Sequence, residues 1–228
     1  MFLLLLLAPL LLFSTPICHF SPPPGWEFAL PKNLSPHIQV GFIGKGSSDF
    51  RPSINLALEE VDVSLKEYVK SVKKIHLSQP NTTWRDLGKF KQIAGEGRLT
   101  EISSRSGLGE VKMLQAIFIK DHKAYILTAA VEKKDYPNFY PAILQSLQSL
   151  TLSSDLIAAL PREELRQRFS HLYSSLTQEP EEDLENWKKT KWEELQKIVL
   201  EECPEMGGHW QFLALKEGYT KIYSQKLQ

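Results

Sequence analysis

The sequence predicts an α+β protein in which one small domain of strands and helices is followed by a C-terminal helical bundle or arm. Three observations favour this class. Apolar and polar residues alternate over residues 53–61, which is typical of a half-buried strand. Two apolar runs, 113–119 and 125–131, flank a short polar turn, and apolar residues recur at helical spacing after Ser153.

Composition and charge limit the class of protein. With 228 residues and 42% hydrophobic content, the chain is large enough to bury a packed core. Its 27 basic and 27 acidic residues balance, so there is no overall positive charge to attract a phosphate backbone. We therefore expect no nucleic-acid partner.

The chain begins with an apolar run, Phe2 to Phe13, which is shorter than the ~20 residues of a membrane-spanning helix but has the length of a signal-peptide core. Residues 1–18 are therefore predicted to be a signal peptide or a lipoprotein signal, which places the protein in the periplasm or cell envelope. Cys18 stands where a lipoprotein signal carries its acylated cysteine, so a lipid anchor at Cys18 is the expected membrane contact. No Lys or Arg precedes the run, and Ile17 is bulky for such a signal. A buried N-terminal strand or helix is the alternative.

The cysteine count excludes a disulfide framework. Cys18 and Cys203 are the two cysteines of the chain. Cys203 and His209 supply two ligands, fewer than the three or four that zinc requires. We expect no metal and no cofactor.

Residues 19–36 are rich in proline and are predicted to form a linker and lead-in, which reaches a first short strand at residues 26–28. A second strand is expected over residues 37–45. The loop Gly44 to Ser48 resembles a phosphate-binding loop, but it leads into a strand and lacks the Gly-Lys-Ser/Thr ending on a helix. We interpret it as a hairpin loop.

An amphipathic helix is predicted from Ser64 to Leu77, with Ser64 as its N-cap and Leu65, Val69 and Val72 on one face. Lysines occupy most of the opposite face. We interpret that face as solvated; attraction of an acidic partner or of anionic lipid is the alternative.

Three strand-like stretches follow, at residues 84–95, 97–104 and 109–131, the last folded into a hairpin at residues 120–123. The two apolar runs of this hairpin alternate little, so both of their faces are expected to be covered. A helix is predicted over residues 138–150.

The order of these elements carries a resemblance. The pieces are Ile54–Leu56, Leu65–Val69, Gly95–Thr100, Leu114–Ile119, Lys123–Ala129 and Tyr140–Leu150. Over residues 25–152 this order resembles the PsbP/DcrB-like superfamily. The resemblance implies an antiparallel sheet with helices on both faces, in proteins that mostly act as binding or accessory modules. It transfers no ligand residue to this chain, because no shared motif names one.

Residues 153–228 form the predicted helical region, with three apolar stripes. These are Leu165, Phe169, Leu172 and Leu176; Leu184, Trp187, Leu195 and Ile198; and Phe212, Leu215, Tyr219 and Ile222. Aromatic residues are frequent interface anchors, although at helical spacing they usually belong to a core. The predicted partner interface consists of Trp192, Trp210, Tyr219 and Tyr223.

No hydrolase elbow, zinc-protease motif or local Cys–His pair is found in the sequence, so we expect no enzyme. The leading hypothesis is an exported, envelope-associated, non-catalytic binding or accessory protein that acts through protein–protein contacts. A small-ligand or lipid carrier of the envelope is the alternative, and an unrecognised hydrolase comes third.

Overall fold

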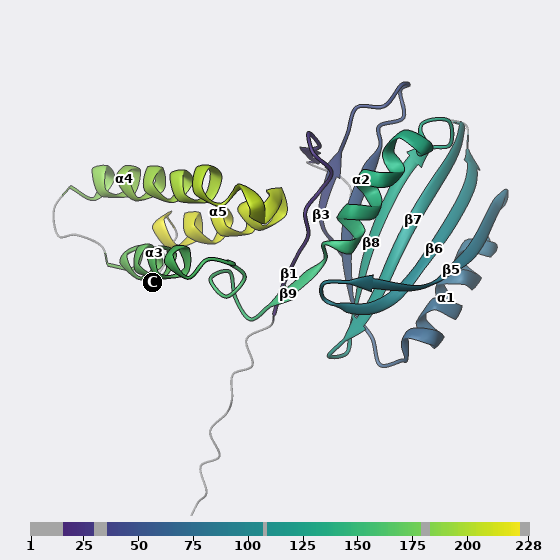
Figure 1. Ribbon diagram of the computed structural model, residues 1–228, viewed down its shortest axis with the longest axis horizontal. Helices are drawn as coiled ribbons and strands as arrows, with labels where there is room; N and C mark the ends of the chain where they lie inside the picture. Colours follow the sequence, from purple (N-terminus) through teal and green to yellow (C-terminus); the bar gives the residue numbers. More distant parts are fainter. Residues whose placement is uncertain (1–15, 30–35, 107–108, 179–182, 224–228) are drawn as a thin grey trace, which may run out of the picture.

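The computed structural model describes residues 16–29, 36–106, 109–178 and 183–223. It contains an α/β part and a helical part side by side, with a small two-stranded ribbon between them (Figure 1). The α+β class expected from the sequence is confirmed.

The strands are β1 Ile17–His19, β2 Glu27–Phe28, β3 Ile38–Ile43, β4 Ser53–Glu60, β5 Thr82–Gln92, β6 Gly95–Ser106, β7 Gly109–Lys120, β8 Lys123–Glu132 and β9 Thr151–Ser153. The helices are α1 Leu65–Leu77, α2 Tyr136–Gln148, α3 Glu163–Ser175, α4 Leu184–Lys197 and α5 Gly207–Tyr223, with a π-helical turn at Ile198–Glu202 and a 3₁₀ turn at Pro204–Met206.

Seven strands form one antiparallel sheet in the order β2-β3-β4-β8-β7-β6-β5. The hairpin between β7 and β8 turns at Asp121 and His122, whose φ angles of 51° and 59° match the two left-handed central residues of a type I′ turn. Residues 114–118 of β7 are all buried, so both faces of this central strand are covered, as predicted.

The two faces of the sheet are covered by different helices. On one face, α2 buries Ile143 and Leu147 in a core that contains Leu127 and Phe118. On the other face, α1 buries Val69 against Ile117, Ala124 and Ile126. Helices on both faces are therefore observed, as expected.

Helix α1 begins where the sequence places its N-cap. The Ser64 side chain accepts a hydrogen bond from the backbone N–H of Glu67, and the Glu67 carboxylate accepts one from the backbone N–H of Ser64 at 3.0 Å. This capping box satisfies donors that the first turn would otherwise leave unpaired. It fixes the start of the helix that borders the candidate site.

The expected linker over residues 19–36 is corrected at its start. Strand β1 pairs with β9, the strand that follows α2, and Phe20 is completely buried against Phe42 with ring centroids 5.8 Å apart. Phe20 belongs to the core of the α/β part, so this part begins before residue 25. The local composition did not indicate this position, because β1 is held there by pairing with β9, a strand about 130 residues later in the sequence.

The helical part has its own core, formed by α3, α4 and α5. Leu165, Phe169, Leu172 and Leu176 are all buried, as the first predicted stripe requires. The third stripe is wrong in part: α5 buries Trp210, Ala214, Gly218 and Ile222, whereas Tyr219 is 53% exposed. Phe212 packs instead on Phe28 of β2, because the first turns of α5 lie against the α/β part.

Candidate functional site

A groove of about 680 Å³ lies between α1 and the strands β5 and β6. We call it the α1–β5 groove. Its apolar wall is formed by Leu65 and Val69 of α1 and by Trp84 of β5. The remaining residues that line it are Lys66, Lys70, Lys73, Asp86, Lys89, Glu96, Gly97 and Arg98.

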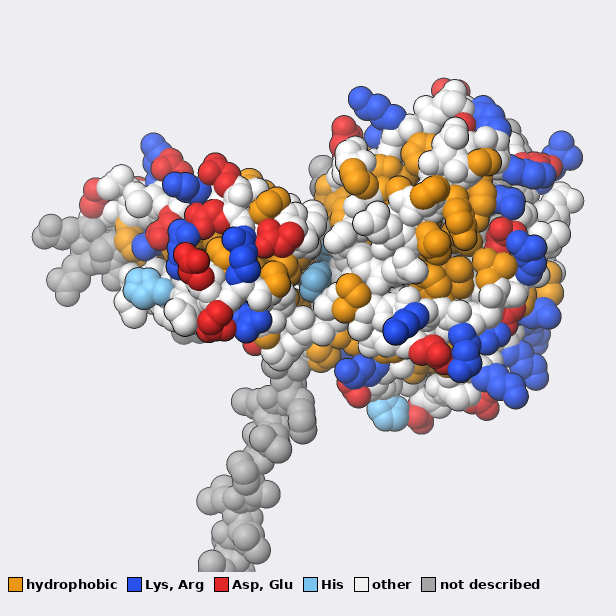
Figure 2. Space-filling view, in the orientation of Figure 1, with side chains coloured by type: hydrophobic (Ala, Val, Ile, Leu, Met, Phe, Trp, Pro, Cys, Tyr) orange, Lys and Arg blue, Asp and Glu red, His pale blue; other side chains and the backbone are white. Residues whose placement is uncertain are grey.

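The charges around this groove are unequal. Both carboxylates are neutralised, since Asp86 pairs with Arg98 and Glu96 pairs with Lys89 at 2.9 Å. Within the described part of the chain, no carboxylate lies within ion-pair distance of Lys66, Lys70 or Lys73. Figure 2 shows Lys and Arg side chains gathered along the edge of the α/β part where α1 lies. The groove therefore combines an apolar wall with an excess of positive charge.

The ring of Trp84 contacts one of the groove lysines. The Nζ atom of Lys73 lies 5.3 Å from the centroid of the Trp84 ring, within the range of a cation–π contact. The indole Nε1 of Trp84 is buried and has no acceptor among the described residues. Trp84 therefore contributes its ring to the groove wall and holds Lys73 beside it, while its Nε1 lies below the groove surface.

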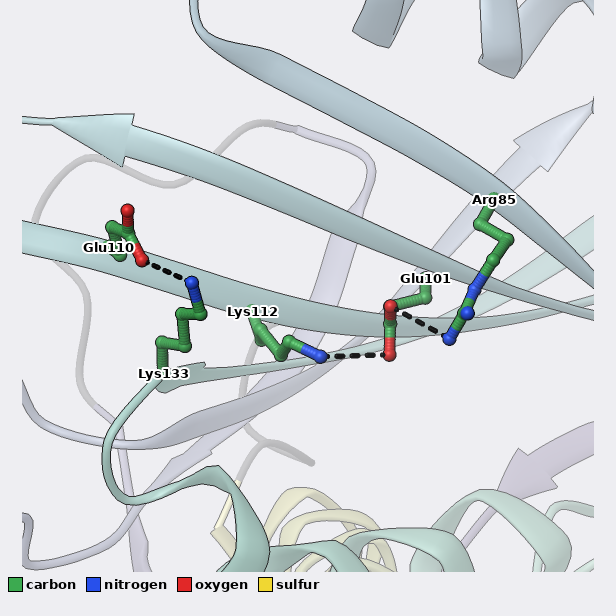
Figure 3. Close-up of polar contacts among 5 residues, drawn as sticks. All are labelled: Arg85, Glu101, Glu110, Lys112 and Lys133. Carbon is green, nitrogen blue, oxygen red and sulfur yellow. Dashed lines mark hydrogen bonds and ion pairs between the residues drawn. The ribbon is translucent and has the colours of Figure 1, made fainter.

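On the opposite face of the sheet the charged residues are paired with one another. Glu101 of β6 lies between Arg85 of β5, at 3.1 Å, and Lys112 of β7, at 3.3 Å, and Glu110 pairs with Lys133 at 2.6 Å (Figure 3). These cations are neutralised within the fold. The contrast distinguishes the α1 lysines from ordinary surface charge.

The predicted lipidation residue, Cys18, is 8% exposed in β1 and belongs to the core of the α/β part. Burial raises the pKa of its thiol above the usual range. Acylation of Cys18 would require this strand to leave the core. Phe2 to Phe13 lies outside the described residues.

The four residues of the predicted partner interface separate into two environments. Trp210 is completely buried, and its Nε1 donates to the carbonyl oxygen of Leu156 at 3.2 Å. Its assignment to an exposed interface is therefore wrong, because α5 turns it into the helical core. Trp192, Tyr219 and Tyr223 form a row of aromatic contacts at centroid distances of 5.6 and 4.5 Å, in which Tyr219 and Tyr223 are 53% and 38% exposed.

Cys203 and His209 are both buried. Cys203 belongs to the core of the helical part, and His209 lies at the border with the α/β part, beside Phe20. Across the described ranges, no group of three or more His, Cys, Asp or Glu residues is placed to hold a metal ion. No helix in those ranges has both the length and the apolar character that crossing a bilayer demands.

The fold and the groove define a class by architecture: a seven-stranded antiparallel sheet with a helix on each face, followed by a helical C-terminal region. No family model and no curated protein sequence matches the chain. Solved structures do match over about 55–61% of the chain, and they include PsbP and Mog1 proteins, so the fold expected from the sequence resemblance is the fold observed.

Three of these structures are LpqN of Mycobacterium tuberculosis, described as involved in cell envelope biogenesis, the PsbP protein CyanoP of Synechocystis, and the Ran-binding protein Mog1p of Saccharomyces cerevisiae. LpqN is 11% identical, with a TM-score of 0.49 over 61% of this chain and 85% of its own. CyanoP is 12% identical, with a TM-score of 0.44 over 61% and 93%, and Mog1p is 18% identical, with a TM-score of 0.40 over 56% and 83%. At these identities the likeness concerns the fold.

Sequence patterns identified the α1 side of the groove and missed the side formed by β5 and β6. The helical periodicity of residues 64–77 identified the lysine face of α1, which was interpreted as solvated. It missed Trp84, Lys89 and Arg98, which reach the same groove from β5 and β6. The signal that points to them is the alternation of polar and apolar residues in β5, but the face that α1 covers depends on the tertiary structure.

Proposed function

We propose that this protein is a non-catalytic binding protein of the cell envelope, and that the α1–β5 groove binds an acidic, partly apolar segment of a partner polypeptide. The observation that carries the proposal is the set of three lysines, Lys66, Lys70 and Lys73, which border an apolar wall and form no ion pair among the described residues, although Glu67 and Asp86 interact with them at longer range. Complementary charge steers and orients a partner, and apolar contact adds affinity.

The shape of the groove favours an extended segment. The groove follows α1 from Leu65 to Lys73, nine residues or about 13 Å, which an extended peptide of about four residues matches. In an extended peptide, alternate side chains point to opposite sides. Apolar side chains would contact Val69 and Trp84, and acidic ones would reach the lysines.

The alternative function, a small-ligand or lipid carrier, requires a cavity that encloses most of an apolar ligand. The α1–β5 groove is bordered along α1 by exposed lysines, so an apolar ligand there would remain in contact with water. The binding protein is therefore the function that this groove supports better. The same proposal includes the location of the protein, which is export to the cell envelope with a lipid anchor at Cys18.

The test measures binding of a fluorescent peptide in which Glu and Leu alternate, using anisotropy. The triple variant Lys66→Gln, Lys70→Gln, Lys73→Gln is compared with Lys188→Gln, Lys189→Gln, Lys191→Gln on α4. The α4 lysines already pair with Glu185, Glu193 and Glu194. Both triples remove the same charge, so they separate the groove from a general charge effect.

We expect the α1 triple to weaken binding by at least about tenfold, equivalent to about 1.4 kcal/mol, and the α4 triple to leave it nearly unchanged. Binding should also weaken with rising salt, because the groove lysines are exposed. Equal losses in the two triples would refute the groove. If the protein bound anionic vesicles and did not bind the peptide, the polypeptide partner would be refuted and the groove would be a site for a membrane surface.

A further inference from the structure

Strand β1 lies between the two parts of the molecule and presents one side to each of them (Figure 1). Ile17 packs on the core of the helical part, whereas Cys18 and Phe20 belong to the core of the α/β part. Successive side chains of a strand point to opposite sides, so His19 is on the same side as Ile17, toward the helical part. His19 is 7% exposed, as a position inside the contact between the two parts requires.

The start of α5 brings a second histidine to this contact. His209 is 2% exposed, and the centroid of its ring lies 5.2 Å from that of Phe20. Gly207, two residues earlier, lies against Ser21. The two histidines are close enough that a charge on His19 lowers the pKa of His209. Two titratable rings are therefore enclosed where the helical part meets the α/β part.

Neither ring has the surroundings that a charged imidazolium needs. The Nε2 atom of His19 and the Nδ1 atom of His209 are buried and form no hydrogen bond with the described residues. A protonated imidazole carries an N–H on both nitrogens, so protonation would leave a buried donor without an acceptor at each of these atoms. Burial is the largest cause that lowers the pKa of both rings.

The charged groups of the surrounding elements do not offset this cost. Strand β9 contains no titratable residue, and Cys18 points to the opposite side of β1. Within the described part of the chain, no carboxylate is among the causes that shift the pKa of either histidine. The carboxylates of β2 and of the turns before α5 pair instead with arginines: Glu27 with Arg51 at 3.5 Å, Glu205 with Arg162 at 3.0 Å, and Glu202 with Arg168.

The two parts can separate without the loss of either core. Their buried clusters have no residue in common, and the chain passes from the α/β part to the helical part once, after β9. Opening at the contact exposes only the side chains that meet there. It therefore requires less free energy than the unfolding of either part.

We propose that His19 and His209 form an acid-sensitive latch, whose protonation releases the helical part from the α/β part while both cores stay folded. Release gives both imidazolium rings access to water. Exposed histidines titrate near pH 6.5, so the closed form is fully favoured above about pH 6.5 and loses this advantage as the pH falls toward about 4. With two histidines, the equilibrium constant for opening rises by up to about a hundredfold per pH unit. The latch does not depend on the function proposed for the α1–β5 groove.

The experiment measures side-chain exposure in the full-length protein by hydroxyl-radical footprinting and mass spectrometry between about pH 7 and about pH 5. Phe28 and Phe212 report on the contact, and Phe118 and Phe169 report on the two cores. We expect oxidation of Phe28 and Phe212 to increase several-fold on acidification, and oxidation of Phe118 and Phe169 to stay nearly constant. Small-angle X-ray scattering should show a larger radius of gyration at the lower pH, with an unchanged far-UV circular dichroism spectrum.

Variants of the two histidines connect this response to the latch. His19→Leu and His209→Leu, tested singly and together, remove the titrating rings and keep the contact apolar. Each single variant should reduce the pH dependence of opening to about tenfold per pH unit or less, and the double variant should abolish it. His171→Leu, at an exposed position of α3, is the matched control and should behave like the parent protein.

Two results would overturn the latch. One is an unchanged acid response in both single variants or in the double variant, because other groups would then drive the opening. The other is oxidation of Phe118 and Phe169 that rises together with that of Phe212, because the protein would then unfold as a whole. If the double variant does not fold, the single variants decide.

Discussion

The ring of Phe212 in α5 packs against the ring of Phe28 in β2, with centroids 4.4 Å apart. This contact joins the helical part to the edge of the seven-stranded sheet. Gly207 and Gly208, at the start of α5, lie against Ser21, Pro22 and Phe42 in the same region. The helical region is therefore docked on the α/β part through α5.

The first prediction concerns this docking. Phe212→Ala should lower the free energy of unfolding by about 1–3 kcal/mol, because it removes an aromatic pair and opens a gap beside β2. Proteolysis between β9 and α3 should become faster. Chemical denaturation and timed trypsin digestion measure the two effects. Tyr223→Ala, at an exposed position of the same helix, is the control, and equal effects of the two changes would contradict the docking role of Phe212.

The second prediction concerns the boundary of the α/β part. A fragment of residues 16–153 should be more stable than one of residues 25–152 by about 3 kcal/mol or more, because only the longer one contains β1 and the buried Phe20. Urea denaturation followed by circular dichroism gives the comparison. Phe20→Ala in the longer fragment should remove most of the difference, and fragments of equal stability would show that β1 does not belong to this core.

The third prediction concerns two histidines buried near the contact between the two parts. Burial lowers the pKa of His19 to about 4, and burial together with the nearby His19 lowers the pKa of His209 to about 3. Unfolded histidines titrate near pH 6.5, so below that pH the unfolded chain binds more protons than the folded one. The histidine contribution to stability is therefore complete above about pH 6.5 and falls between about pH 6.5 and pH 4, by several kcal/mol in order of magnitude.

Melting curves between pH 7 and pH 4 test this dependence. The double variant His19→Leu, His209→Leu should show a smaller loss of stability over that range, whereas the exposed His171→Leu should behave like the parent protein. If the double variant loses as much stability on acidification as the parent, other groups dominate the pH dependence.

The fourth prediction concerns the close approach of α4 and α5. Gly218 is buried, and a Cβ atom there would lie 2.1 Å from Cδ2 of the completely buried Leu195. Gly218→Ala should therefore destabilise the protein by about 1–3 kcal/mol, although alanine is the better helix former. Thermal denaturation measures the change. Adding Leu195→Val should recover part of the loss, and a stabilised single variant would show that the two helices can move apart at no cost.

Local periodicity determined the regular elements. The alternation at residues 53–61, the spacing of residues 64–77 and the turn at Asp121 and His122 each depend on neighbours in the sequence, and the structure has β4, α1 and the β7–β8 hairpin there. The buried run in β7 likewise predicted a central strand. These signals depend only on residues close together in the chain, so they can be identified in a single sequence.

The tertiary structure alone decided which residues meet. The burial of Trp210 and the exposure of Tyr219 depend on how α5 is rotated between two neighbours, and both residues fit a helical stripe equally well. Phe20 enters the core because β1 pairs with a strand about 130 residues later, and Trp84 and Gln115 face α1 because of the register of the sheet. Such contacts join distant segments, and their choice depends on the packing free energy of the whole fold, which local sequence patterns do not contain.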